Sequence, residues 1–227
     1  MSSQLAIWRA KDEHGRRRRG TWSGTYSGKR FYCIDPRADE VCYDDTVVGV
    51  AREYRYGNQT RDVYSVLVHE MLVSEFVEKI ALERGWPLHL AIDAAREDLV
   101  HDHGEAYTLD LPAPFKKHWS MWGYRRMTNR VQSAVFQHFG VYPTKQTTAL
   151  VHEVDVRLRV DEVEQLMIDP ELYGEKHGGI EGLGAEIPDM TVEQSSDAFG
   201  LRFQKIFPEY LAVGSLLRPV CMTRAVH

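Results

Sequence analysis

The sequence predicts an all-α fold, because apolar residues recur at the three- and four-residue spacing of amphipathic helices along most of the chain. Glycine or proline follows several of these segments, as at helix ends. With 227 residues, 43% hydrophobic and 27% charged, the composition is that of a globular chain. We therefore expect one domain over residues 1–227, with its core at about 41–168, an N-terminal extension at 1–40, and a loop and final helix at 169–227.

The first half of the chain is expected to hold three helices. Residues 1–40 show no helical stripe, since Trp, Thr, Tyr and Gly alternate there, and they are expected to be extended or irregular. A short helix over 46–52 follows two acidic residues, which favour a helix start. A long helix from about Asp62 to Arg84 ends at Gly85. A further helix is expected from about Leu88 to His103.

The second half is expected to hold three more helices. After two prolines, residues 115–139 show a helical stripe that Gly140 ends. The next helix spans about Gln146 to Met167. The glycine-rich stretch 174–184 lacks the Gly-Lys-Ser/Thr ending of a phosphate-binding loop, which predicts a flexible loop. A final helix begins at Thr191, where the Thr-x-x-Gln spacing is typical of a capping box.

Candidate metal ligands lie on three of these expected helices. His69 falls on the apolar stripe that includes Val66 and Leu72, so its imidazole should point inward. Asp155 lies on a similar stripe, and a buried carboxylate costs several kcal/mol unless it is paired, protonated or metal-bound. An inward-facing histidine is often only a hydrogen-bonded core residue. Together, two imidazoles and two carboxylates would suit a divalent cation: His69, His101, Asp102 and Asp155.

The order of these residues, His, then His-Asp, then Asp, resembles the HD-domain metal-dependent phosphohydrolases. Within them, the similarity is greatest to the deoxynucleotide phosphohydrolases of bacteria and phages. Similar segments lie at 21–36, at 52–57 ahead of His69, at 101–116 and at 155–162. The 101–116 segment is the most specific, because His-Asp-x-x-Glu runs on to Asp-Leu-Pro-Ala-Pro-Phe-Lys. The resemblance covers roughly residues 21 to 167.

The resemblance implies roles for further residues. It implies one divalent ion (Mn, Co, Mg, Ni or Zn) on the four candidate ligands, with Glu105 as a catalytic carboxylate. Asp110 would be a proton donor or sugar reader, and Arg55 and Lys116 would hold the phosphate. Tyr56 would pack against the sugar or base, although ordinary core packing explains it equally well. His103 stands where the family commonly has a small residue, and is expected to be a second-shell donor or an extra ligand.

The implied activity is hydrolysis of deoxyribonucleoside 5'-monophosphates to deoxynucleoside and phosphate. A dNTP triphosphohydrolase, acting for example on dATP, is the nearest alternative. A non-catalytic nucleotide-binding regulator is a further alternative. The metal ligands are shared by both enzyme activities, so they do not distinguish a monophosphate from a triphosphate substrate.

Charge and hydropathy limit the expected partners. The net charge of −5 and the pI near 6.1 argue against a general nucleic-acid binder, so no stable nucleic-acid partner is expected. The basic run Arg16–Arg19 is interpreted as a solvated loop tip in preference to a phosphate contact. No apolar run is long enough to span a bilayer, and no signal peptide is recognisable, which favours the cytoplasm of a bacterium or phage-infected host. Apolar residues at 211–217 favour a homo-oligomer contact or a buried terminal element equally.

Overall fold

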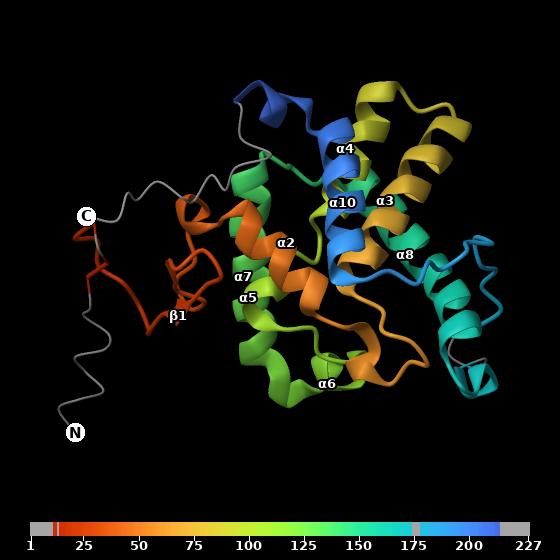
Figure 1. Cartoon of the computed structure of the whole chain (residues 1–227), viewed down its shortest axis with the longest axis horizontal. Coiled ribbons are helices and arrows are strands. Elements are labelled where there is room, and N and C mark those ends of the chain that lie inside the picture. Colours follow the sequence, from red (N-terminus) through yellow and green to blue (C-terminus); the bar gives the residue numbers. More distant parts are fainter. Residues whose placement is uncertain (1–10, 13, 174–177, 214–227) are drawn as a thin grey trace.

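The computed structural model describes residues 11–12, 14–173 and 178–213, and within them it is predominantly helical (Figure 1). The all-α prediction is confirmed. The helices, in chain order, are α2 (Tyr43–Arg52), α3 (Val66–Glu83), α4 (Leu88–Leu99), α5 (Glu105–Thr108), α6 (Ala113–Lys117), α7 (Trp122–Phe139), α8 (Lys145–Leu166) and α10 (Val192–Ile206). Short 3-10 turns are η1 (Ala38–Glu40), η2 (Arg55–Asn58), η3 (Trp119–Met121), η4 (Pro170–Tyr173) and η5 (Pro208–Val213). No helix in these ranges combines the length and the apolar character needed to cross a bilayer.

Over residues 11–12 and 14–40 the N-terminal extension is irregular, as predicted, apart from one small hairpin and the turn η1. Its strands β1 (Ser23–Gly24) and β2 (Arg30–Phe31) are antiparallel, with Ser23 opposite Phe31. Phe31 is fully buried, and its ring stacks on Tyr107 of α5 with the ring centroids 3.8 Å apart. The extension is therefore attached to the helical body beside α5.

The expectation that the basic run Arg16–Arg19 is a solvated loop tip is wrong for Arg18, whereas Arg17 and Arg19 are exposed. The Arg18 side chain is fully buried and forms ion pairs with Asp12, Asp35 and Glu40. Its guanidinium also lies 4.0 Å from the centroid of the Tyr32 ring. Burying a guanidinium is costly unless it is paired, so these carboxylates explain its position. The ion pairs of Arg18 connect separate parts of the N-terminal extension. Its guanidinium is therefore not available to bind a phosphate.

Two groups of buried apolar side chains form the core, and α3 contributes to both. One group joins α2, α3, α4, α7 and α10, and the other joins α3, α4 and α8. Helices α3, α4 and α8 pack against one another, and α10 also packs against α3 (Figure 1). Phe31 and the α10 residues Phe199 and Phe203 are fully buried, so the core extends beyond the predicted limits of 41–168 at both ends.

Two predicted helices are shorter or broken. The helix expected over 88–103 ends at Leu99, so the His101–Asp102 pair lies in a turn. The helix expected over 115–139 is divided into α6, η3 and α7. The capping box at Thr191 is confirmed, because its hydroxyl accepts from the Gln194 backbone and the Gln194 side chain accepts from the Thr191 backbone. The apolar segment 211–217 lies outside the residues whose side chains the structure describes.

A glycine sets the distance between α2 and α5, the helix that begins with Glu105. A Cβ atom on Gly49 would lie 2.8 Å from Cα of Ala106, closer than such contacts allow. We expect Gly49→Ala to lower the free energy of unfolding by about 1–3 kcal/mol, as overpacking does. Gly200→Ala is the control, since Gly200 lies in α10 with nothing within 4 Å and should gain up to about 1 kcal/mol. Urea unfolding measures both; equal stability of the two variants would contradict this account.

Candidate metal centre

Helix α3 places His69 inside the protein, one turn after its N-terminus. Ser65 caps α3 by accepting from the Val68 backbone N–H. The imidazole is fully buried. Its Nδ1 lies 2.6 Å from Oε1 of Glu162, whereas Nε2 makes no hydrogen bond and lies 3.2 Å from Oδ1 of Asp155. A carboxylate on one ring nitrogen is the usual arrangement of a metal-binding histidine, and it leaves Nε2 as the ligand atom.

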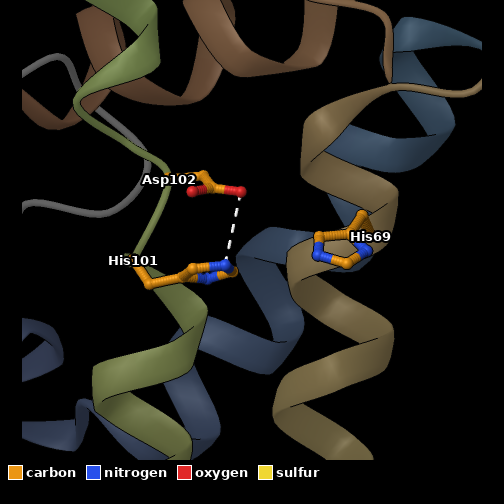
Figure 2. Close-up of side chains that lie close together, drawn as sticks. All are labelled: His69, His101 and Asp102. Atoms are coloured by element: carbon orange, nitrogen blue, oxygen red, sulfur yellow. Dashed lines mark ion pairs between the residues drawn. The ribbon is translucent and has the colours of Figure 1, made fainter. Parts of the chain in front are cut away.

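The turn after α4 brings His101 and Asp102 to the same place. Nδ1 of His101 lies 2.7 Å from the Asp98 carbonyl, and its Nε2 lies 3.3 Å from Oδ2 of Asp102. Figure 2 shows the rings of His69 and His101 turned toward each other, with the Asp102 carboxylate on the same side. One ligand atom from each of the three residues lies within 4.8 Å of the other two. His69, His101 and Asp102 can therefore hold a metal ion together.

Long-range hydrogen bonds fix this turn. The side chain of Gln132, on α7, donates to the Val100 carbonyl at 2.7 Å and accepts from the Gly104 backbone at 2.9 Å. Oε1 of the buried Glu70 accepts from the Asp102 backbone at 2.8 Å. Because both ends and the middle of the turn are bonded to other helices, His101 and Asp102 are held in place without a ligand.

Asp155 lies beside the three-residue group but is not part of it. Its Oδ1 faces Nε2 of His69, and its Oδ2 accepts from Arg159 at 2.7 Å. Burial opposes ionisation, but the close approach and charge of His69 and the charge of Arg159 outweigh it and lower the pKa of Asp155. Asp155 is thus an ionised carboxylate directed at the proposed ligand nitrogen of His69.

Glu162 is the site residue that the sequence reasoning did not select. It is fully buried and accepts from Tyr56 at 2.5 Å and from Tyr64 at 2.9 Å, in addition to its contact with His69. Burial raises its pKa, but Arg55 and His69 more than compensate and bring the pKa of Glu162 down to about 2. Its signal in the sequence is the seven-residue spacing from Asp155, which places both carboxylates on one face of α8.

The electrostatic field at the turn favours a cation. Burial acts to lower the pKa of His101, but the charges of Asp102, Asp98 and Glu70 raise it to about 10. Burial raises the pKa of Asp102, but the positive charges of His101 and Arg55 lower it by more, so that the pKa lies below its usual value. The same negative potential that holds a proton on an imidazole also attracts a divalent ion, which competes with that proton.

Glu105, Asp110 and Lys116 form a second cluster next to the candidate ligands. The Lys116 ammonium lies 2.5 Å from Oε1 of Glu105 and 2.8 Å from Oδ1 of Asp110. Burial and the charges of Asp102 and Asp110 raise the pKa of Glu105 well above its usual value, against the opposing effect of Lys116. Oε2 of Glu105 is buried and makes no hydrogen bond to the described residues. The structure therefore brings these three predicted residues together.

Arg55 lies between the ligand group and Glu162, whereas Tyr56 is attached to Glu162. Nη1 of Arg55 is 3.7 Å from Oδ2 of Asp102, and its Nη2 is 3.5 Å from Oε2 of Glu162. The Tyr56 hydroxyl donates to the same Glu162 oxygen. The structure thus places Arg55 beside Asp102, and it pairs the Tyr56 hydroxyl with Glu162.

His103 is not one of the residues whose ligand atoms converge. Its ring is fully buried between Phe139 and Phe199, with centroid distances of 6.0 and 5.2 Å. Its Nε2 lies 3.2 Å from Oε2 of Glu70. Glu70 also accepts from the Asp102 backbone. His103 therefore contacts a residue that holds Asp102 in place, as expected for a supporting residue and not for an additional metal ligand.

The arrangement defines a candidate metal centre in a helical protein. No family model matches the chain. The chain is 30% identical over 123 residues to the uncharacterized protein YfdR of Escherichia coli strain K12, over 54% of this chain and 61% of that protein. It is 28% identical over 149 residues to an uncharacterized Rhodobacter capsulatus protein, RCAP_rcc00048, over 63% of this chain and 72% of that protein. The chain thus spans about three fifths of the length of the Escherichia coli relative.

Removing the charge of Glu162 should weaken metal binding without removing a ligand. We expect Glu162→Gln to lower Mn²⁺ affinity about 10- to 100-fold, because the carboxylate that orients His69 is lost. Isothermal titration with Mn²⁺ measures this. Glu164→Gln is the matched control, since Glu164 is exposed on the same helix. Equal affinities of the two variants would refute the orienting role.

Proposed function

We propose that this protein is a metal-dependent phosphohydrolase acting on deoxynucleotides, most simply cleaving a deoxyribonucleoside 5'-monophosphate to nucleoside and phosphate. One observation carries the proposal: the ligand atoms of His69, His101 and Asp102 converge within 4.8 Å, with Arg55 beside them. The imidazoles and the carboxylate can bind a metal ion, and the nearby guanidinium can bind a phosphate next to that ion. The sequence resemblance to the HD-domain phosphohydrolases supports the same activity.

The donor set fits one divalent ion, with Asp155 as a fourth ligand. Mn, Co, Mg, Ni and Zn are all compatible with two imidazoles and two carboxylates. The short approach of Asp155 to Nε2 of His69 supports its inclusion. When bound, the ion supplies Lewis-acid polarisation of the phosphoryl group and favours ionisation of water.

The chain's own residues account for binding and proton transfer. Arg55 and Lys116 hold the phosphate oxygens, with Arg55 suited to a bidentate contact. Glu105 accepts the proton of the attacking water at its unpartnered Oε2, since Oε1 is occupied by Lys116. The proton that Glu105 takes from the water passes through Lys116 to Asp110, which delivers it to the leaving sugar oxygen as the P–O bond breaks. The raised pKa of Glu105 makes its ionised carboxylate a stronger acceptor for that proton.

The substrate class can be tested with a panel of nucleotides. We expect phosphate release from dAMP to exceed that from AMP by up to about 10²-fold, the discrimination that shape alone provides against an added hydroxyl. Product masses distinguish the alternatives. Equal rates on AMP and dAMP would contradict the sugar preference, and tripolyphosphate from dATP without action on dAMP would favour the triphosphohydrolase. Nucleotide binding without any hydrolysis, in protein loaded with metal, would favour the non-catalytic regulator.

A further inference from the structure

Acidic residues are absent from a long stretch of this acidic chain. The 227 residues include 33 Asp and Glu, yet none of them lies between Leu111 and His152. The Lys and Arg residues of the same stretch are Lys116, Lys117, Arg125, Arg126, Arg130 and Lys145. The negative charge that disfavours nucleic-acid binding by the whole chain is therefore confined to other segments, and a local positive surface remains.

Helix α7 presents part of this charge on its outer face. Val131 and Val135 are fully buried and bind α7 to the core. On the outer face, Trp122, Arg126 and Arg130 follow one another at four-residue intervals, which aligns them along the helix. Trp122 is 61% exposed, and the Arg126 guanidinium lies 5.4 Å from the centroid of its ring. The outer face thus places one aromatic ring and two guanidinium groups in a row along α7.

This outer face borders a hollow of about 420 Å³. Its lining residues are Trp122, Arg125, Arg126, Asn129, Arg130 and Ser133. Arg125 is fixed, because its Nη1 donates to the carbonyls of Lys116 at 2.6 Å and His118 at 2.8 Å. Within the described residues, neither Arg126 nor Arg130 forms an ion pair with a carboxylate. The hollow therefore offers cations and neutral polar groups, and no carboxylate that would repel an anion.

Exposed aromatic rings continue this surface beyond the hollow. Phe115 of α6 is 64% exposed and Trp119 of η3 is 80% exposed. Figure 1 shows α6 next to the beginning of α7, the green helix, and η3 contacts both, so Phe115 and Trp119 lie on segments adjacent to the first turn of α7. A free mononucleotide of suitable size would fill the hollow but leave Phe115 and Trp119 in water. A chain of several bases and phosphates matches the whole surface.

We propose that the surface formed by α6, η3 and the outer face of α7 binds single-stranded nucleic acid. The bases stack on Trp119 and Trp122, and the phosphates contact Arg126 and Arg130. Stacking on aromatic side chains combined with a positive groove is how proteins bind single strands without sequence preference. The surface adjoins the candidate metal centre, because α6 also carries Lys116, but the phosphate contacts proposed here are those of Arg126 and Arg130, which are not part of that centre.

The full-length protein can be tested with a fluorescein-labelled 20-mer of oligo-dT, by anisotropy in 50 mM salt with EDTA present. Trp122→Ala should weaken binding about 5- to 150-fold, as loss of one stacked base does. Arg126→Glu should weaken binding at least about tenfold and reduce the dependence on salt, by about 0.7 in the log–log slope for each lost phosphate contact. Lys79→Glu is the matched control: Lys79 is likewise an exposed helical cation, 5.7 Å from the Phe76 ring.

Several results would overturn the proposal. These are no binding by the wild-type protein, equal loss in Lys79→Glu and Arg126→Glu, or displacement of the oligonucleotide by millimolar dAMP, which would place it at the metal centre. Concentration-dependent self-association abolished by Trp122→Ala, without oligonucleotide binding, would assign the surface to a second copy of the chain. Circular dichroism checks folding; should Trp122→Ala fail to fold, Trp119→Ala, at a more exposed position, must show the loss instead.

Discussion

Replacing Asp102 by Ala is expected to remove bound divalent metal and phosphohydrolase activity together. Asp102 supplies one of the three converging ligand atoms, and its Oδ2 also lies 3.3 Å from Nε2 of His101. Without this carboxylate, two imidazoles and Asp155 remain, and the neutralising charge for the ion is reduced. Metal content after dialysis and phosphate release from dAMP should both fall to the background level.

The control for this prediction must separate a lost ligand from a lost fold. Asp93→Ala removes an exposed carboxylate from α4 at no expected cost. The thermal midpoint of metal-free Asp102→Ala should stay close to that of the metal-free wild type, because the turn is held through the Asp102 backbone and Gln132. Full activity in Asp102→Ala, or a metal content equal to that of Asp93→Ala, would disprove the assignment of Asp102 as a ligand.

Glu105→Gln is expected to have the second largest effect, and it should separate chemistry from metal binding. The variant should keep a full complement of metal, since Glu105 is not among the converging ligands. It should lose about 10²–10⁴ in turnover, the usual contribution of a general base. The amide can still accept from Lys116 but cannot take a proton from water.

Metal content and turnover must be measured on the same samples of Glu105→Gln. Lys116→Gln serves for comparison, because it should raise KM for dAMP more than it lowers turnover if the ammonium mainly holds phosphate. A turnover that falls only in proportion to the metal content would show that Glu105 acts through the ion and not as the base.

Local sequence patterns predicted much of the helical framework. The apolar stripes located α3 and α8, and Gly85 and Gly140 each follow a helix with a positive φ, as helix-ending glycines do. The inward direction of His69 followed from its position in such a stripe. These features depend on residues within a few helical turns of one another, so they can be predicted from the local sequence.

The turn at His101 could not be predicted in this way. Residues 88–103 read as one helix, whereas the chain leaves the helix after Leu99 because Gln132 and Glu70 bond its backbone groups. These partners are about 30 residues away in the sequence. The burial of Arg18 was missed for the same reason, since its carboxylate partners include Glu40. Long-range pairing of polar groups leaves no periodic signal in the sequence.

The roles of the site residues depend on a bound ion, and anomalous diffraction tests this most directly. Crystals of the full chain grown with Mn²⁺ should show a single strong anomalous peak between Nε2 of His69, Nε2 of His101 and the Asp102 carboxylate, with Asp155 completing the protein ligands. The same crystals of Asp102→Ala should lack the peak. A wild-type map with no peak at these atoms, at a Mn²⁺ concentration that supports activity, would contradict the metal centre.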